Sequence, residues 1–74
     1  MRHLSDLSIK EFKKYFPSKY LGSETNINSI INSLDNFAGF HYAISKYGIP
    51  DTYMNLENNG FDVRFLLRRQ LKNN

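Results

Sequence analysis

Residues 46–53 read KYGIPDTY, and this stretch determines where the chain changes direction. Gly48 can adopt the left-handed conformation that commonly ends a helix. Pro50 cannot continue the helix because it lacks a backbone N–H. One helix is therefore predicted to end near residue 47. A second, short helix is predicted to follow over residues 51–58, before the break at Asn59-Gly60.

Upstream of this stretch, apolar residues recur with the 3.6-residue period of a helix. They predict one central helix over residues 25–47 with an asparagine-rich opposite side. Gly39 lies within the pattern, where glycine costs up to about 1 kcal/mol relative to alanine. Either it is tolerated on the polar side, or it marks a bend that divides the helix. The residues expected to face inward are Ile27, Ile30, Ile31, Leu34, Phe37, Ala38 and Ile44.

The N-terminal part carries a helix start signal at Ser8. Glu11 lies three residues later, so the two side chains can form a capping box. Leu7 and Phe12 are placed to form a hydrophobic staple around this start, and Pro17 stops the helix. The prediction is a helix over residues 8–16. Its apolar face would consist of Ile9, Phe12, Tyr15 and Phe16.

The last third of the chain has two interpretations. As a helix over residues 62–72, it would turn four apolar residues inward and four basic residues outward. As a β-hairpin over residues 53–67, it would turn at Asn59-Gly60, a strong two-residue hairpin signal. The helix is favoured because Leu66-Leu67 breaks the strand alternation. The predicted fold is therefore mainly α, a single domain over residues 1–74 built as a small bundle of three to four helices.

Length and composition restrict the class of protein. A chain of 74 residues builds a small core, so a partner or self-association often supplies part of its stability. It has no cysteine, which fits a reducing cytoplasm. No apolar run approaches the roughly 18 residues of a membrane span, and the N-terminus lacks the apolar region of a signal peptide. These features predict a cytoplasmic protein that does not enter membranes.

Positive charge is concentrated towards the two ends of the chain, which has a net charge of +3. No Lys or Arg occurs between Tyr20 and Ser45. Such basic patches can hold phosphate or an acidic protein surface. The abundance of Asn, Lys, Ile, Tyr and Phe matches AT-rich codons, which suggests a gene from a phage, a mobile element or a low-GC bacterium.

No group of residues indicates a reaction. His41 lies on the apolar side of the central helix, where a lone histidine is usually a core residue that donates one hydrogen bond. No further ligand at helical spacing accompanies it, so no metal and no cofactor are predicted. A catalytic site needs a pocket with positioned groups, for which a core of this size has little room. The sequence therefore predicts a protein that is not an enzyme.

Aromatic residues exceed what so small a core can hold. Phe12, Phe16, Phe37 and Phe61 are expected inside, and Phe40 and Tyr42 at the flanks of the central helix. Exposed aromatics beside arginines are typical anchors of a protein interface. The first hypothesis is a binding protein that inhibits or recruits a larger host protein or protein–nucleic acid complex of the nucleic-acid-handling or defence machinery. Its predicted contacts are Tyr53, Arg64, Phe65, Arg68, Arg69 and Lys72.

The segment from Ala43 to Met54 resembles the centre of helix-turn-helix DNA-binding domains of the pipsqueak and resolvase type. The similarity rests on a small residue, an aromatic-Gly-Ile-Pro turn and a following Thr. It implies that residues 51–58 form a recognition helix, which Ile49 and Met54 would pin to the core. The second hypothesis is therefore a DNA-binding regulator, acting as a homodimer. Its exposed candidates are Asp51, Thr52, Asn55 and Asn58, with Lys13 and Lys14 on phosphates.

Overall fold

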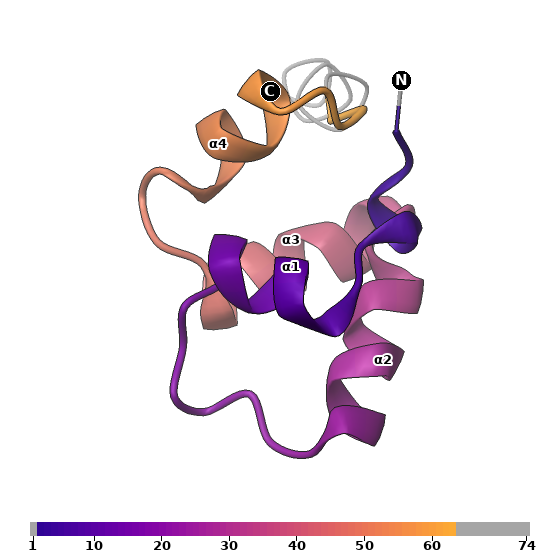
Figure 1. Cartoon of the computed structure of the whole chain (residues 1–74), viewed down its shortest axis with the longest axis vertical. Helices are drawn as coiled ribbons and strands as arrows, with labels where there is room; N and C mark the ends of the chain where they lie inside the picture. The colour runs from indigo at the N-terminus through magenta and orange to yellow at the C-terminus, as the bar shows by residue number, and fades with distance from the viewer. Residues whose placement is uncertain (1, 64–74) are drawn as a thin grey trace.

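The computed structural model describes residues 2–63, which form a mainly α bundle (Figure 1). A 3-10 turn, η1 (Leu4–Asp6), precedes α1 (Ile9–Tyr15), α2 (Glu24–Ser33), α3 (Phe37–Tyr47) and α4 (Thr52–Asn58). α2 packs against η1, α1 and α3, while α4 packs against α1. The buried side chains form one hydrophobic cluster. The predicted helical fold class is confirmed.

α1 begins with the predicted capping box. The Ser8 hydroxyl accepts the Glu11 N–H at 3.1 Å, and the Glu11 carboxylate accepts the Ser8 N–H at 3.2 Å. At the other end, Phe16 follows the last helical residue and Pro17 prevents continuation. Phe12 and Phe16 are fully buried and stack with their ring centroids 4.4 Å apart. α1 thus anchors the core with residues one turn apart.

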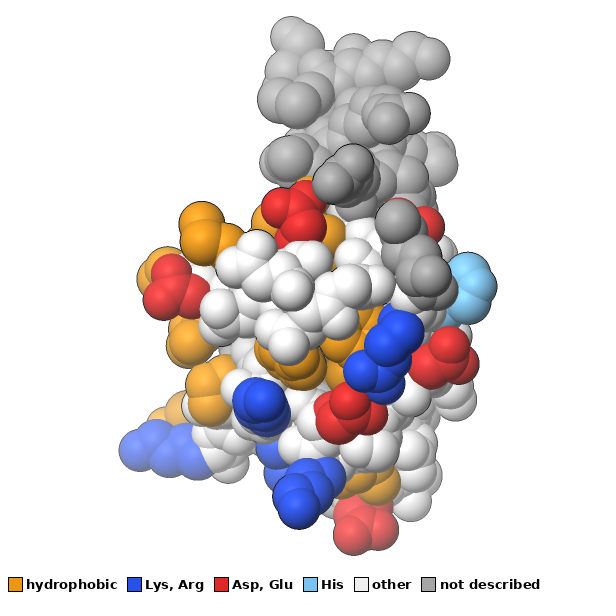
Figure 2. Space-filling view, turned by 45° about the horizontal axis from the view of Figure 1, so that its top comes forward, with side chains coloured by type: hydrophobic (Ala, Val, Ile, Leu, Met, Phe, Trp, Pro, Cys, Tyr) orange, Lys and Arg blue, Asp and Glu red, His pale blue; other side chains and the backbone are white. Residues whose placement is uncertain are grey.

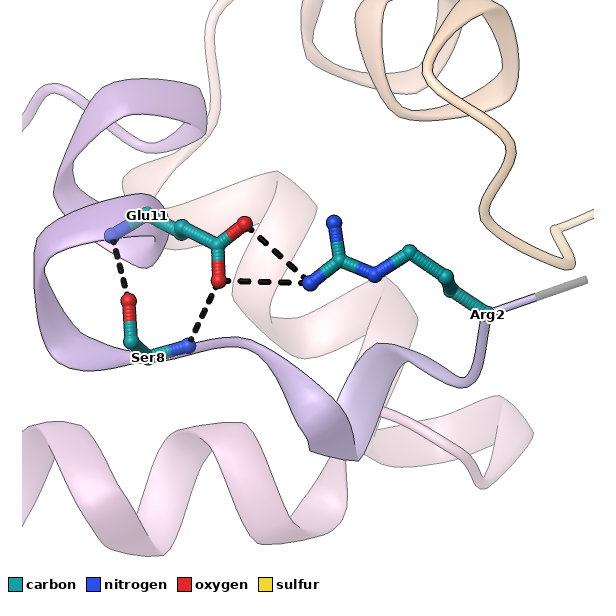
Figure 3. Close-up of polar contacts among 3 residues, drawn as sticks. All are labelled: Arg2, Ser8 and Glu11. Carbon is teal, nitrogen blue, oxygen red and sulfur yellow. Dashed lines mark hydrogen bonds and ion pairs between the residues drawn. The ribbon is translucent and has the colours of Figure 1, made fainter.

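Arg2 fastens the N-terminal segment to this cap (Figure 3). Its guanidinium forms an ion pair with the Glu11 carboxylate at 3.1 Å. The Ser8 backbone N–H, and then Arg2, hold the pKa of Glu11 below its ordinary value, because both stabilise the charged carboxylate. Arg2 also lies over the Phe61 ring, 4.4 Å from its centroid. This side chain therefore joins α1 to the segment that follows α4.

The single central helix predicted over residues 25–47 is wrong, because the chain divides into α2 and α3. Asn36 starts α3 by accepting the Gly39 N–H at 2.7 Å. Asp35 accepts the Leu4 N–H at 3.1 Å and the Ser5 hydroxyl, so η1 is held against the break between α2 and α3. A Cβ on Gly39 would lie 2.2 Å from the Ser33 carbonyl oxygen. Of the two roles considered for Gly39, the structure therefore shows the bend.

The break changes which side of α3 faces the core. Phe40, expected at a flank, is 1% exposed, whereas Ala38, expected inside, is exposed. Phe37 and Ile44 are only partly buried, while Ala43 and Tyr47 complete the buried side. A new helix start resets the angular position of every residue after it. A pattern read continuously from α2 therefore assigns the wrong face to the first turn of α3.

The short helix predicted over residues 51–58 is confirmed as α4. The alternative hairpin over residues 53–67 is wrong, because residues 53–58 are helical, and no strand occurs within residues 2–63. Asp62 and Val63 are not helical, and the remainder of the helix predicted over 62–72 lies outside the described residues. Past α4, the Arg2 N–H donates to the Gly60 carbonyl and the Asp62 N–H to the Arg2 carbonyl, both at 3.0 Å.

Candidate functional site

The turn between α3 and α4 is built from residues 48–51. The Gly48 N–H donates to the Ile44 carbonyl at 3.0 Å, which closes α3. The predicted left-handed conformation of Gly48 is wrong, since its φ is −79°. Glycine is required here for a different reason: a Cβ would lie 2.7 Å from the Ile44 carbonyl oxygen. The close approach lets the chain leave α3 sharply.

Thr52 fixes the position of α4. Its side chain is fully buried, and its hydroxyl donates to the Tyr15 carbonyl at 2.8 Å while accepting the Ile49 N–H at 2.9 Å. One hydroxyl thus joins the end of α1, the turn and the start of α4. The expectation that Thr52 is exposed to a base edge is wrong, because both hydrogen bonds are internal and no water-facing surface remains.

Replacing Thr52 with valine, which has nearly the same shape, is expected to destabilise the fold. The change leaves the buried Tyr15 carbonyl and the Ile49 N–H without this partner, at a cost of about 2 kcal/mol. Urea unfolding monitored by circular dichroism measures the difference. Thr25→Val, at an exposed position of α2, is the matched control and is expected to change stability by less than about 0.5 kcal/mol. Equal effects of the two changes would contradict the role given to Thr52.

Ile49 and Met54 do not pin α4 to the core, contrary to the expectation from the resemblance. They are 42% and 60% exposed, and Pro50 between them in sequence is exposed as well. α4 instead turns Thr52 and Leu56, one helical turn apart, towards the interior. Met54 lies two residues from each, about 200° around the helix from Thr52, and so faces outward.

We call Ile49, Pro50, Asp51 and Met54 the α3–α4 corner. At the left edge of the molecule in Figure 2, the side on which Figure 1 shows the connection from α3 to α4, hydrophobic side chains lie at the surface. The Asp51 carboxylate is exposed and makes no cap hydrogen bond to α4. All charged residues between Gly48 and Val63 are acidic. The α3–α4 corner is therefore an exposed apolar surface that includes one carboxylate, that of Asp51.

Most of the predicted protein contacts cannot be placed. Tyr53 is half-buried, and its hydroxyl donates to the Val63 carbonyl at 3.2 Å, while its ring meets Phe40 edge-on at 6.3 Å. Tyr53 therefore contributes to packing between α3 and α4. The other predicted contacts lie outside the described residues: Arg64, Phe65, Arg68, Arg69 and Lys72.

The predicted DNA contacts lie mostly on two helices that pack against each other. Lys13 and Lys14 are exposed on α1, and Asn55 and Asn58 are exposed on α4, two helices in contact with each other. Of the other two members of that group, Asp51 is exposed just before α4, and Thr52 is buried with its hydroxyl on the Tyr15 carbonyl of α1.

Two further aromatic side chains are exposed beside lysines. Tyr42 is 55% exposed, and its hydroxyl accepts a hydrogen bond from the Lys46 ammonium at 2.9 Å. This bond raises the pKa of Lys46, because it favours the charged ammonium. Tyr20 is 76% exposed, with the Lys19 ammonium 5.9 Å from its ring centroid. Both pairs are local contacts between residues near in sequence, and neither joins two helices.

His41 packs its ring against Phe37, with the centroids 4.4 Å apart. Its Nε2 is buried and has no hydrogen-bond partner among the described residues, so this nitrogen does not make the hydrogen bond expected of a core histidine. Within residues 2–63, no three His, Cys, Asp or Glu side chains come together as metal ligands would. The histidine therefore contributes an aromatic contact to α3.

In the part of the chain that the structure describes, no helix has the length and apolar character needed to cross a bilayer. Comparison of the chain with protein-family models, with curated proteins and with solved structures gives no match.

Proposed function

We propose that this chain is a non-catalytic binding protein that docks on a larger protein through the α3–α4 corner. The observation that carries the proposal is the exposure of Ile49 and Met54 within six residues of each other. Apolar and methionine side chains at a turn are suited to the centre of a protein interface, and methionine adapts its shape to a partner. Covering a large aliphatic side chain fully contributes about 1.5–3 kcal/mol.

This proposal changes the predicted contacts and keeps the predicted class of function. The α3–α4 corner replaces Tyr53 as the proposed partner contact, because the Tyr53 ring packs on Phe40 and its hydroxyl bonds to the Val63 carbonyl. A host complex of the nucleic-acid-handling or defence machinery, bound in order to inhibit or recruit it, stays the predicted partner. A phage or mobile-element origin stays a prediction from composition.

Affinity capture from the native host, with nuclease present, tests the proposal. A protein partner should remain bound to the wild type, and the double change Ile49→Ser, Met54→Ser should weaken its binding about thirty-fold, which corresponds to a 2 kcal/mol hot spot. Tyr20→Ser, which removes a large side chain that is even more exposed and lies elsewhere, is the control. Thermal unfolding verifies that both variants fold. Unchanged binding of the Ile49/Met54 variant to the captured protein would refute the corner as the docking surface.

DNA binding is a second candidate function, favoured by the contact between α1 and α4. The packing of α1 against α4 supports this candidate, because α1 carries Lys13 and Lys14 for phosphates and α4 carries Asn55 and Asn58 for base edges. Two features weigh against it. Asp51 precedes α4 and Glu57 lies in its last turn, so acidic groups stand at both ends of the helix. α4 also has no Lys or Arg, although cationic contacts supply most duplex affinity.

The salt dependence of binding to duplex DNA separates the two functions. A DNA-binding protein should lose affinity steeply between about 50 and 200 mM salt, because each cationic contact to a phosphate releases bound counterions. Lys13→Ala should weaken binding to all sequences alike, and Asn55→Ala should relax the preference for one sequence. Absence of duplex binding at low salt would eliminate this candidate.

A further inference from the structure

The chemistry of the α3–α4 corner restricts what can cover it. Ile49 and Met54 offer aliphatic and thioether surface, and Pro50 adds a rigid apolar edge to the turn. A purely polar partner would gain nothing from these groups, because the gain comes from removing apolar surface from water. The occupant therefore has to bring at least one aliphatic or aromatic side chain.

Charge restricts the occupant further. Within residues 2–63, the Asp51 carboxylate gives α4 no side-chain cap and takes part in no ion pair. No Lys or Arg lies in the sequence from Gly48 to Val63 that could neutralise it locally. A second carboxylate brought against Asp51 would be repelled, and an apolar group placed over it would leave a charge without solvent. A guanidinium or ammonium is the group that this position accepts.

We infer that the α3–α4 corner binds a basic, apolar segment of a partner protein. An aliphatic side chain of that segment covers Ile49 and Met54, and a neighbouring Arg or Lys pairs with Asp51. The inference rests on the proposed function and specifies its partner. Arginine fits best, because its planar guanidinium can pair with a carboxylate in two-pronged fashion while its stem packs on apolar surface.

Methyl NMR of the full chain tests the inferred partner chemistry with three synthetic peptides of equal length that differ at two positions. The first carries leucine and arginine there, the second leucine and glutamate, and the third serine and arginine. The leucine–arginine peptide should shift the methyl signals of Ile49 and Met54, and the other two should shift them weakly or not at all. Asp51→Asn should weaken the binding of that peptide about three- to fivefold, the upper part of the range for a solvent-exposed ion pair. Asp6→Asn, which removes an exposed carboxylate at η1, is the matched control.

Several outcomes would overturn the inference. If the leucine–glutamate peptide binds equally well, or if Asp51→Asn has no effect, the partner segment does not need a basic residue. Methyl shifts that depend on protein concentration alone would assign the corner to a second copy of the chain. Shifts caused by duplex DNA and by no peptide would favour the second candidate function. If the captured partner requires Ile49 and Met54 and tolerates Asp51→Asn, the proposed function stands and this inference fails.

Discussion

Gly39→Ala is expected to lower the free energy of unfolding by about 2–3 kcal/mol, because overpacking a tight contact costs this much. The new Cβ would meet the Ser33 carbonyl oxygen at 2.2 Å and the Ser33 Cβ at 2.8 Å. Backbone atoms cannot rotate away as a flexible side chain can, so the corner between α2 and α3 has to open. That movement would also disturb Asp35, which holds η1 through the Leu4 N–H.

The sign of this effect is what makes the substitution informative. In the middle of an exposed, continuous helix, replacing glycine with alanine stabilises by up to about 1 kcal/mol. One continuous helix would therefore predict a more stable variant, and the observed break between α2 and α3 predicts a less stable one. Urea unfolding of the variant measures the difference. Ser29→Ala, at an exposed position of α2, is the control and should be neutral or slightly stabilising. A Gly39→Ala protein more stable than wild type would contradict the tight break between α2 and α3.

Phe40→Ala is expected to have the largest effect on stability, a loss of about 3–5 kcal/mol. The side chain is 1% exposed, and its ring meets Tyr53 of α4 edge-on. Truncation removes a large apolar surface and leaves a cavity between α3 and α4. A domain of 74 residues has a total stability of about 4–11 kcal/mol, so the variant should be largely unfolded at the lower end of that range.

Tyr42→Ala is the matched control, because it removes an aromatic ring of similar size two residues away in the same helix. Tyr42 is 55% exposed, and its hydroxyl bonds only to the exposed Lys46 among the described residues. Its loss should change stability by less than about 1 kcal/mol. Calorimetric unfolding of the two variants compares them directly. A larger effect at Tyr42 than at Phe40 would mean that α3 is rotated relative to its described position.

The two substitutions also bear on the α3–α4 corner. α4 is held by Thr52 against α1 and by Tyr53 against Phe40, so its exposed side depends on both contacts. A protein weakened at Phe40 should lose partner binding together with its fold. Ile49→Ser and Met54→Ser should lose binding alone. This separation allows a structural defect to be distinguished from a defect in docking.

The sequence by itself determined the features that depend on neighbouring residues. The capping box of α1 needs Ser8 and Glu11 three residues apart, and Pro17 ends that helix through its own missing N–H. The boundary near residue 47 followed from the Gly-Ile-Pro turn, and α4 was predicted to within one residue. Each of these signals acts over a few residues, so a local reading of the chain is sufficient to find it.

Tertiary structure decided the features that depend on segments far apart in the chain. The break between α2 and α3 is stabilised by Asp35 bonding to η1, a contact over 31 residues. Thr52 is buried against α1, where the Tyr15 carbonyl, 37 residues away, accepts a hydrogen bond from its hydroxyl. With Thr52 and Leu56 turned inward, Met54 had to face outward, and Ile49 remained exposed on the turn before α4. Periodicity states which residues share a face, and only packing against another segment decides which face is covered.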